Sequence, residues 1–265
     1  MCGITGIYDM TGQGGVDPSV MKIMANTLIH RGPDDSGCYA DRHMGFGFRR
    51  LSIIDLSTGS QPMFNEDKTI VSVCNGEIYN YKELRDRLIS KGHRFYTNCD
   101  VEILVHLYEE YGTEFLNLLN GQFAFAICDK KTNLLMLGRD HVGIAPLFYA
   151  SVNNHFVFAS EIKAILKHPG VKREVNLTAL DQIFSFPGMI SPQTMFQGIS
   201  ALKPGHYLTV RNEQIEAKEY WDLSYPEISD IEWGKPESYY VEKLDELLTQ
   251  AVRYRLQADV PVGFI

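Results

Sequence analysis

The sequence predicts an α+β fold in which antiparallel β-sheet is covered on its outside by helices. Short segments rich in β-branched and aromatic residues dominate the chain as far as about residue 225. Three segments with helical periodicity interrupt them. The strands predicted in the range 121–160 are joined by connections too short for helical crossovers, so these strands must pair antiparallel.

Each predicted element ends at a residue type that commonly terminates it. The first helix covers about 18–29, and the second and third cover 79–92 and 101–112. The second and third helices stop at Gly92 and Gly112, since glycine adopts the backbone conformation that closes a helix at little cost. The predicted strands, which end in Gly, Asp, Asn or Lys signals, are 69–76, 121–129, 133–140 and 155–161.

The character of the chain changes near residue 225. The polar stretch SYPEISDIEWGKPES contains two prolines and is typical of a linker. A helical pattern follows it, and an apolar helical face of this kind needs a partner that covers it. The apolar residues at helical spacing are Val241, Leu244, Leu247, Leu248, Ala251 and Val252.

Composition excludes several classes of function. The 265 residues are 45% hydrophobic and carry a net charge of −8, which argues against nucleic acid or an anionic membrane as the main partner. No apolar run is long enough to cross a bilayer, and the N-terminus lacks a basic region followed by an apolar stretch, so we expect a cytoplasmic protein. The five cysteines lie at scattered spacings without a Cys-x-x-Cys pair, and they predict neither a disulfide framework nor a metal site.

The opening MCGITGIYDM supports two interpretations of Cys2. The residue can simply begin a buried strand, because cysteine is among the most often buried residue types. Alternatively, removal of Met1, usual before a small second residue, would leave Cys2 with a thiol and a free α-amine. The reference pKa is about 7.7–8.0 for the amine and about 8.5 for the thiol, so the amine can take the thiol proton. Cys2 would then be a nucleophile that carries its own base.

Three further stretches each have a structural and a functional interpretation. In FRRLSIIDL, the doubled arginine is either solvated or a bidentate clamp on a carboxylate. In VCNGEIYN, Asn75 and Gly76 form either a turn or a pair of N–H donors to an oxyanion. In TNCDVEIL, Asp100 is either a helix N-cap or an anion for a substrate ammonium group.

Taken in order, these stretches resemble one family. The matching motifs are MCGI, HRGPDDSG, RRLSIIDL, QPM, NGEIYNYKELR, TNCDVEIL, GQFAFAICD, RDHVGIAPLFY and FASEIKAIL. Together they resemble the glutaminase domain of glutamine-dependent asparagine synthetases over about residues 2–210. The resemblance implies a four-layer αββα sandwich of the N-terminal nucleophile hydrolase type.

The resemblance also implies a set of site residues for glutamine. The nucleophile falls on Cys2 and the oxyanion donors on Asn75 and Gly76. Glutamine is a zwitterion with an amide at its far end, so a selective site needs a cation for its carboxylate and an anion for its ammonium group. The implied glutamine-binding residues are Arg50, Leu51, Ser52, Ile53, Ile54, Asn75, Gly76, Glu77 and Asp100.

The C-terminus departs from the family pattern. The chain stops at VPVGFI, whereas full-length asparagine synthetases continue from DVPVG into a Ser-Gly-Gly-x-Asp-Ser loop that binds ATP. We therefore expect a glutaminase domain at 2–210, a linker at 211–236 and the start of a truncated synthetase domain at 237–265. This chain then needs no cofactor, and ATP and magnesium belong to the missing domain.

The expected partners are glutamine and, in the full-length enzyme, the synthetase domain of the same polypeptide. A homodimer is an option that the sequence leaves open. Two alternatives to the glutaminase remain at this stage. One is an N-terminal nucleophile hydrolase of another amide, which would not need Arg50, Glu77 and Asp100 around one small zwitterion. The other is a non-catalytic glutamine-binding or regulatory module, against which the intact Cys2 argues.

Overall fold

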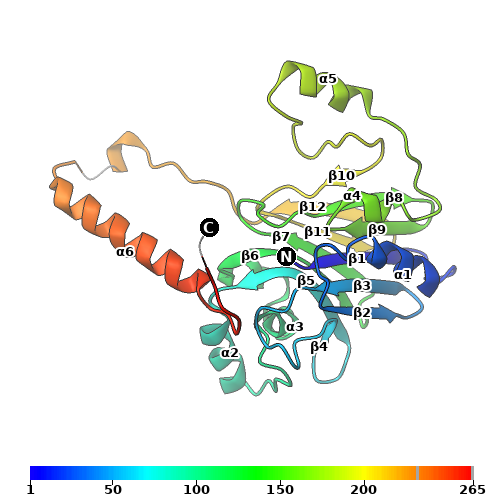
Figure 1. The fold of residues 1–265 in the computed structure, drawn as a ribbon, viewed down its shortest axis with the longest axis horizontal. Coiled ribbons are helices and arrows are strands. Elements are labelled where there is room, and N and C mark those ends of the chain that lie inside the picture. The colour runs from blue at the N-terminus through cyan, green and yellow to red at the C-terminus, as the bar shows by residue number, and fades with distance from the viewer. Residues whose placement is uncertain (231–232, 264–265) are drawn as a thin grey trace.

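The computed structural model describes residues 1–230 and 233–263, and in it two six-stranded sheets pack face to face between two layers of helices (Figure 1). Every strand pair in both sheets is antiparallel. The predicted α+β class and the four-layer αββα arrangement are therefore confirmed.

The first sheet carries the N-terminal strand at its centre. Its strand order is β10-β8-β9-β1-β3-β2, so β1 lies between β9 and β3. Cys2 directly precedes β1, and Arg50 ends β3. The bounds are β1 Gly3–Asp9, β2 Asp35–Ala40, β3 Met44–Arg50, β8 Phe148–Val152, β9 His155–Ala159 and β10 Ser200–Ala201.

The second sheet has the order β12-β11-β7-β6-β5-β4. Its longest ladder joins β5 to β6 over nine residue pairs, from Ile70 opposite Asp129 to Ile78 opposite Gly121. Asn75 and Gly76 lie inside this ladder, so the interpretation of these two residues as a turn is wrong. The bounds are β4 Met63–Phe64, β5 Ile70–Ile78, β6 Gly121–Asp129, β7 Leu134–Arg139, β11 His206–Arg211 and β12 Gln214–Glu219.

The main core fills the space between the two sheets. Successive side chains of a strand point to opposite faces, so alternate residues of each sheet meet across this space. Phe46 and Phe48 of β3 pack there with Val71 and Val73 of β5, all fully buried. Complete burial of such side chains contributes about 1.5–3 kcal/mol each, which makes this layer the main support of both sheets.

Helices cover the outer face of each sheet. Helix α1 (Pro18–Asn26) and the short helix α4 (Ile162–Ile165) bury apolar residues against the first sheet. Helix α2 (Tyr81–Ser90) and helix α3 (Ile103–Tyr111) do so against the second sheet. The 3₁₀ turns η1 (Asp100–Glu102) and η2 (Gly112–Leu118) flank α3.

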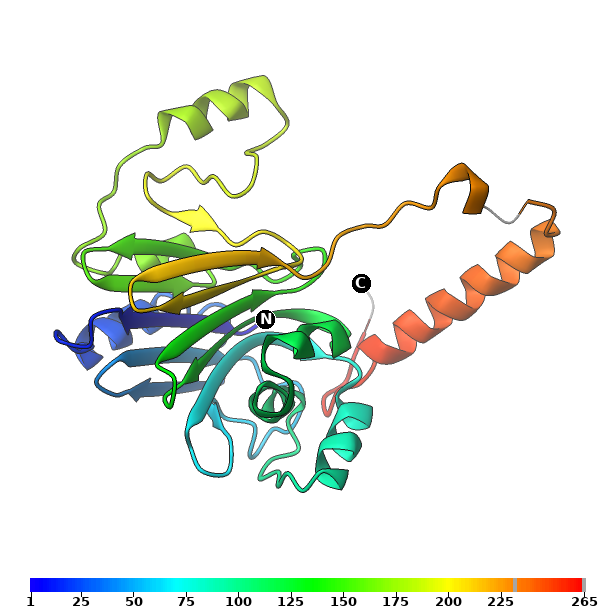
Figure 2. The same cartoon turned by 180° about the vertical axis from the view of Figure 1, so that it is seen from behind.

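Helices α1, α2 and α3 lie where periodicity predicted them, with small shifts at their ends, whereas α4 was not predicted. The first stops at Asn26, after which the chain continues in turns. Helix α3 ends at Gly112, whose φ of +54° lies in the region that favours glycine. Helix α5 (Leu177–Ser185), which the sequence did not single out, stands apart from the sheets in both views (Figures 1 and 2).

The C-terminal part leaves the sandwich after β12. Helix α6 (Glu237–Arg255) projects away from both sheets, and its residues are exposed or half-buried (Figure 2). A 3₁₀ turn, η3 (Ile228–Asp230), precedes it. The expected domain end at residue 210 falls inside the hairpin of β11 and β12, because β12 still pairs with the second sheet. Within the expected linker and C-terminal segment, 231–232 and 264–265 lie outside the described residues.

Across the described ranges 1–230 and 233–263, the helices all lack the combination of length and apolar character that crossing a bilayer requires.

Candidate active site

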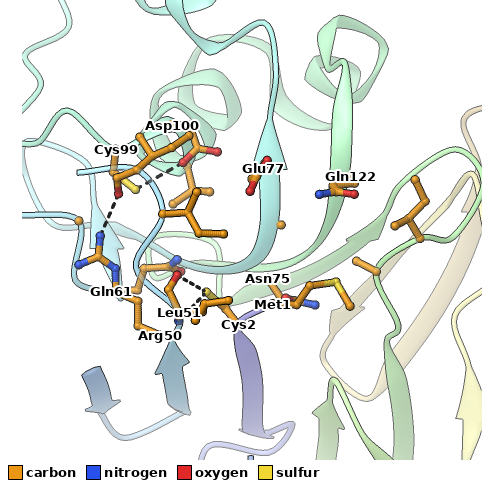
Figure 3. A pocket seen from close by; sticks show the side chains of 17 residues that line it. Met1, Cys2, Arg50, Leu51, Gln61, Asn75, Glu77, Cys99, Asp100 and Gln122 are labelled. Atoms are coloured by element: carbon orange, nitrogen blue, oxygen red, sulfur yellow. Dashed lines mark hydrogen bonds between the residues drawn. The ribbon is translucent and has the colours of Figure 1, made fainter. Parts of the chain in front are cut away.

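A single pocket brings together residues from both sheets (Figure 3). Each predicted site residue lines it except Ser52, whose backbone N–H instead hydrogen-bonds Asp34 Oδ2 at 2.8 Å. Because the lining residues come from segments up to 144 positions apart, the fold rather than local sequence assembles the pocket. Its lining residues are Met1, Cys2, Arg50, Leu51, Ile53, Ile54, Gly59, Gln61, Asn75, Gly76, Glu77, Cys99, Asp100, Val101, Gln122, Ile144 and Ala145.

Cys2 enters the pocket from the start of β1 and is held on two sides. Its Sγ lies 3.4 Å from the backbone N of Leu51 and 3.6 Å from the carbonyl oxygen of the same residue. The Nε of Arg31 donates to the Cys2 carbonyl at 2.8 Å. Burial raises the pKa of the Cys2 thiol, while the Leu51 N–H and the nearby positive chain terminus act to lower it. The thiol of Cys2 therefore faces a pocket at the start of the strand.

Arg50 is buried at the end of β3, so the interpretation of this arginine as a solvated side chain is wrong. Its Nη2 donates to the backbone carbonyls of Ile54 and Asp55, at 3.0 and 2.5 Å. The turn after β3 thus wraps around one edge of the guanidinium group. A Cβ at Gly59 would lie 2.2 Å from Arg50 Nη2 and 2.9 Å from the Asp55 carbonyl oxygen, so glycine allows the turn to approach the guanidinium group closely.

Asn75 is fully buried, and among the described residues neither its Oδ1 nor its Nδ2 has a hydrogen-bond partner. Leaving such a group unsatisfied usually costs about 1–3 kcal/mol. Buried polar groups in native proteins are nearly always hydrogen-bonded, so an exception calls for an explanation. A polar ligand in the adjoining pocket would provide one.

The backbone of β5 directs a second donor toward the pocket. In an antiparallel strand, the N–H and C=O of one residue point to the same edge, and those of the next residue point to the other edge. Cys74 exchanges hydrogen bonds with the Gln61 side chain, and the Ile78 N–H donates to Asp100 Oδ2, both on the edge away from β6. The N–H of Gly76 lies between them on that edge. A Cβ at Gly76 would meet the Gln122 carbonyl at 2.1 Å, which only glycine avoids.

Glu77 and Asp100 give the pocket a negative wall, opposite Cys2 and Asn75 in the view of Figure 3. Burial raises the pKa of the Asp100 carboxyl to about 6, and the nearby charge of Glu77 adds to the rise. Burial also raises the pKa of Glu77. Asp100 is the first residue of η1, whose N-cap is Cys99, so its interpretation as a helix N-cap is wrong, and its carboxylate instead accepts the Ile78 N–H at 2.8 Å.

Sequence reasoning did not single out every residue of the pocket. Gln61, Gln122, Ile144 and Ala145 also line it. Gln61 lies in the QPM motif and Ile144 in RDHVGIAPLFY. Both motifs contributed to the family resemblance, but no site role was assigned to either residue. Cys99 lines the pocket as well, and burial raises its thiol pKa far above the usual range.

A second titratable cluster lies outside the pocket, and both ring nitrogens of its buried member His106 lack a hydrogen-bond partner among the described residues. The possible ligand atoms of Glu66, His93, His106 and Glu109 all lie within 4.8 Å of one another. His106 Nδ1 lies 3.3 Å from Glu66 and its Nε2 lies 3.7 Å from Glu102, while His93 pairs with Glu66 and Glu110. Glu109 also accepts from Asn65 Nδ2 at 3.1 Å, so the cluster links α3 to neighbouring loops.

The fold matches solved structures of known enzymes. One is titled the allosteric regulatory enzyme of purine biosynthesis, with a TM-score of 0.61 at 19% identity over 83% of this chain and 49% of the other. Another is the glutamine phosphoribosylpyrophosphate amidotransferase from Bacillus subtilis, with a TM-score of 0.60, 19% identity and the same coverage. The fold is therefore of the N-terminal nucleophile hydrolase type, and Cys2 lies at a pocket in it.

Within that class, the sequence profile of the glutamine amidotransferase domain matches residues 1–221, and the chain belongs to this family. Its relatives include two glutamine-hydrolysing asparagine synthetases of Bacillus subtilis strain 168. Asparagine synthetase 3 is 39% identical, and the match covers 99% of this chain and 42% of the synthetase. Asparagine synthetase 2 is 41% identical, and the match covers 99% of this chain and 36% of the synthetase. The amidase chyE of Penicillium rubens is 41% identical over 88% of this chain and 34% of its own length.

The chain thus spans about two fifths of the length of these curated relatives. The family places it among the enzymes that act on glutamine, and it does not favour the two alternatives of another amide or a non-catalytic module.

Proposed function

We propose that the chain, once Met1 is removed, hydrolyses the side-chain amide of glutamine with Cys2 as nucleophile. One observation carries the proposal: a single pocket joins the Cys2 thiol, the unpartnered amide of Asn75, the buried guanidinium of Arg50 and the carboxylates of Glu77 and Asp100. These groups match the thioester chemistry and the three polar ends of one glutamine molecule.

Recognition follows from charge. Arg50 binds the α-carboxylate, since a guanidinium can donate two parallel hydrogen bonds to a carboxylate. Its Nη2 is engaged with backbone carbonyls, and this contact fixes the orientation of the plane. Glu77 and Asp100 bind the α-ammonium group. Because the pKa of Asp100 is about 6, this residue is mostly ionised at neutral pH, and the bound cation stabilises the ionised form further.

Catalysis needs no group beyond the processed N-terminus and the pocket. The α-amine of Cys2 takes the thiol proton, and Sγ attacks the amide carbon to give a tetrahedral oxyanion. Asn75 Nδ2 and the Gly76 N–H donate to that oxygen. The intermediate collapses with transfer of the proton from the amine to the leaving nitrogen, which departs as ammonia. Water then attacks the thioester, releases glutamate and restores the thiol.

The fate of ammonia depends on the protein in which the domain acts. We propose that it amidates aspartate in a synthetase domain of the same polypeptide, as the names of the Bacillus relatives suggest. ATP and magnesium would serve that domain, and the glutaminase half would use neither. All five cysteines are free thiols, which is typical of a reducing compartment and supports a cytoplasmic location.

The direct test is glutamate release from glutamine by protein whose mass shows that Met1 is absent. We expect release without ATP or aspartate, and none from the Cys2→Ala variant, which should still bind glutamine. Parallel assays with asparagine and a simple primary amide test selectivity. Wild-type protein that is folded, processed and inactive on glutamine would overturn the proposal.

A further inference from the structure

The segment that follows α6 is hydrogen-bonded to the turn that surrounds Arg50. The backbone N of Asp259 donates to the Ile53 carbonyl at 2.9 Å. In return, the backbone N of Asp55 donates to Asp259 Oδ2 at 2.7 Å. One residue near the C-terminus therefore holds two points of the turn, although more than 200 positions separate it from them.

Asp55 connects this contact to the guanidinium group. Its N–H donates to Asp259 and its carbonyl accepts from Arg50 Nη2, so the same residue touches both. Asp55 has a φ of +54°, a region that non-glycine residues occupy at a cost. Its carboxylate accepts N–H groups of Thr58 and Asn98, at 2.9 and 2.7 Å, and these bonds help to hold the conformation.

The end of α6 and the segment after it also contact the residue that follows β5. Gln257 Nε2 donates at 2.9 Å to the carbonyl of Tyr79, the residue directly after β5. The ring of Tyr254 stacks on that of Tyr79, with 6.3 Å between their centroids, and the guanidinium of Arg255 lies 5.0 Å from the Tyr79 centroid. Tyr254 and Arg255 belong to the last turn of α6, so these contacts anchor the end of the helix and the segment after it to the sandwich.

We infer that Asp259 is a positioning residue for glutamine binding, acting through Asp55 on the orientation of Arg50. This inference rests on the proposed glutaminase function. Displacement of the segment after α6 would release the Asp55 N–H, loosen the turn and weaken the grip on the glutamine carboxylate. The relatives are more than twice as long as the matched region, so in a protein of that length the contact would provide a route by which the rest of the protein changes glutamine affinity.

Asp259→Ala tests the inference because alanine lacks the acceptor for the Asp55 N–H. We expect KM for glutamine to rise about 2- to 10-fold, the effect of losing one hydrogen bond, with kcat changed less than twofold. Asp259→Asn keeps an acceptor oxygen and should restore a KM close to that of the wild type. Asp245→Ala, an exposed aspartate on α6, is the matched control for the loss of charge.

Calorimetric titration of glutamine into the Cys2→Ala background measures binding without turnover, with and without Asp259→Ala. The inference predicts a weaker Kd by the same factor as the rise in KM. An unchanged KM and Kd in Asp259→Ala would overturn it, as would equal losses in the Ala and Asn variants or a fall in kcat alone. An inactive wild type that still binds glutamine would instead overturn the proposed function, and the Kd comparison would still decide the inference.

Discussion

Asn75 shows how a single residue can be unfavourable for folding and useful for catalysis. Its amide is buried without a partner among the described residues, yet it lies in the longest ladder of the second sheet. Such a group is already oriented and desolvated before the oxyanion forms, so it need not reorganise during the reaction.

Asn75→Ala should therefore lower kcat for glutamine hydrolysis about 10²- to 10³-fold, with little change in KM, since the lost hydrogen bond forms mainly in the transition state. The melting temperature should stay equal or rise, because an unsatisfied polar group is removed. Steady-state kinetics and thermal unfolding measure both, with the exposed Asn154→Ala as control. A variant with normal kcat would show that Asn75 is not an oxyanion donor.

Asp100 predicts an acidic limit to activity. Its pKa of about 6 means that the carboxylate becomes protonated as the pH falls below 6, and the protonated form no longer attracts the glutamine ammonium group. We expect kcat/KM to fall below about pH 6 with a slope approaching one, since kcat/KM reports groups of the free enzyme. In Asp100→Asn, kcat/KM should be at least tenfold lower at pH 7.5 and should lose this limb. If kcat/KM of the variant still falls below about pH 6, the titrating group is not Asp100.

For stability, the raised pKa of Asp100 predicts the opposite pH dependence, with the folded protein favoured at low pH. A carboxyl whose pKa is raised by folding stabilises the protein while it is protonated, and this contribution is lost as the pH rises through about 6. At pH 7.5 its ionisation opposes folding by at most on the order of 3 kcal/mol. Asp100→Asn should thus raise the free energy of unfolding at pH 7.5 and leave it nearly unchanged at pH 4, as urea titrations at the two pH values can show. Equal effects at both pH values would contradict the prediction.

At the scale of elements, the edge of β5 that faces away from β6 is hydrogen-bonded at several points along its length. Strand β4 pairs with it at Val71 and Ser72, and beyond them the same edge is bound by side chains. The amide of Gln61 serves Cys74 in place of a neighbouring strand, with bonds of 2.6 and 3.0 Å. The carboxylate of Asp100 does the same for Ile78. Between these attachments the edge stays open for a substrate at Gly76.

Gln61→Ala should remove the first attachment and leave the buried N–H and C=O of Cys74 without their partner. We expect the free energy of unfolding to fall by about 1–3 kcal/mol and kcat to fall with it, because Asn75 follows directly. Gln214→Ala, an exposed glutamine on the edge strand β12, is the matched control and should change neither. A Gln61→Ala protein of unchanged stability would mean that the strand needs no side-chain partner there.

The elements and the pocket were not equally predictable from sequence. Periodicity located β5, β6 and the helices on the second sheet, because each has a strong local pattern. Local pattern could not show that Asn75 and Gly76 continue the strand, since Asn-Gly is a common turn pair and the ladder to β6 decides the matter. Nor could it give a role to Gln61, whose side chain completes a strand edge that exists only after folding.

At the scale of the whole molecule, the central position of β1 places Cys2 at the pocket. Strand β1 lies at the centre of the first sheet, and Cys2 precedes it at a pocket that also receives residues from the second sheet. Met1 lines that same pocket, so any residue before Cys2 occupies space next to the thiol. Sequence pattern could suggest Cys2 as a nucleophile, but packing of the two sheets is needed to bring Asn75 beside it.

A chain extended at its N-terminus should therefore fold normally and lack glutaminase activity. An added residue turns the α-amine of Cys2 into an amide that cannot accept a proton near neutral pH, and it crowds the place of the substrate amide. The core between the sheets does not involve Met1, so thermal unfolding should be unchanged. Activity assays on protein with a protease-cleavable N-terminal tag, before and after cleavage to Cys2, measure the effect, and the same tag at the C-terminus is the control. Full activity in a sample whose mass shows the extension still attached would refute the role of the α-amine as the base.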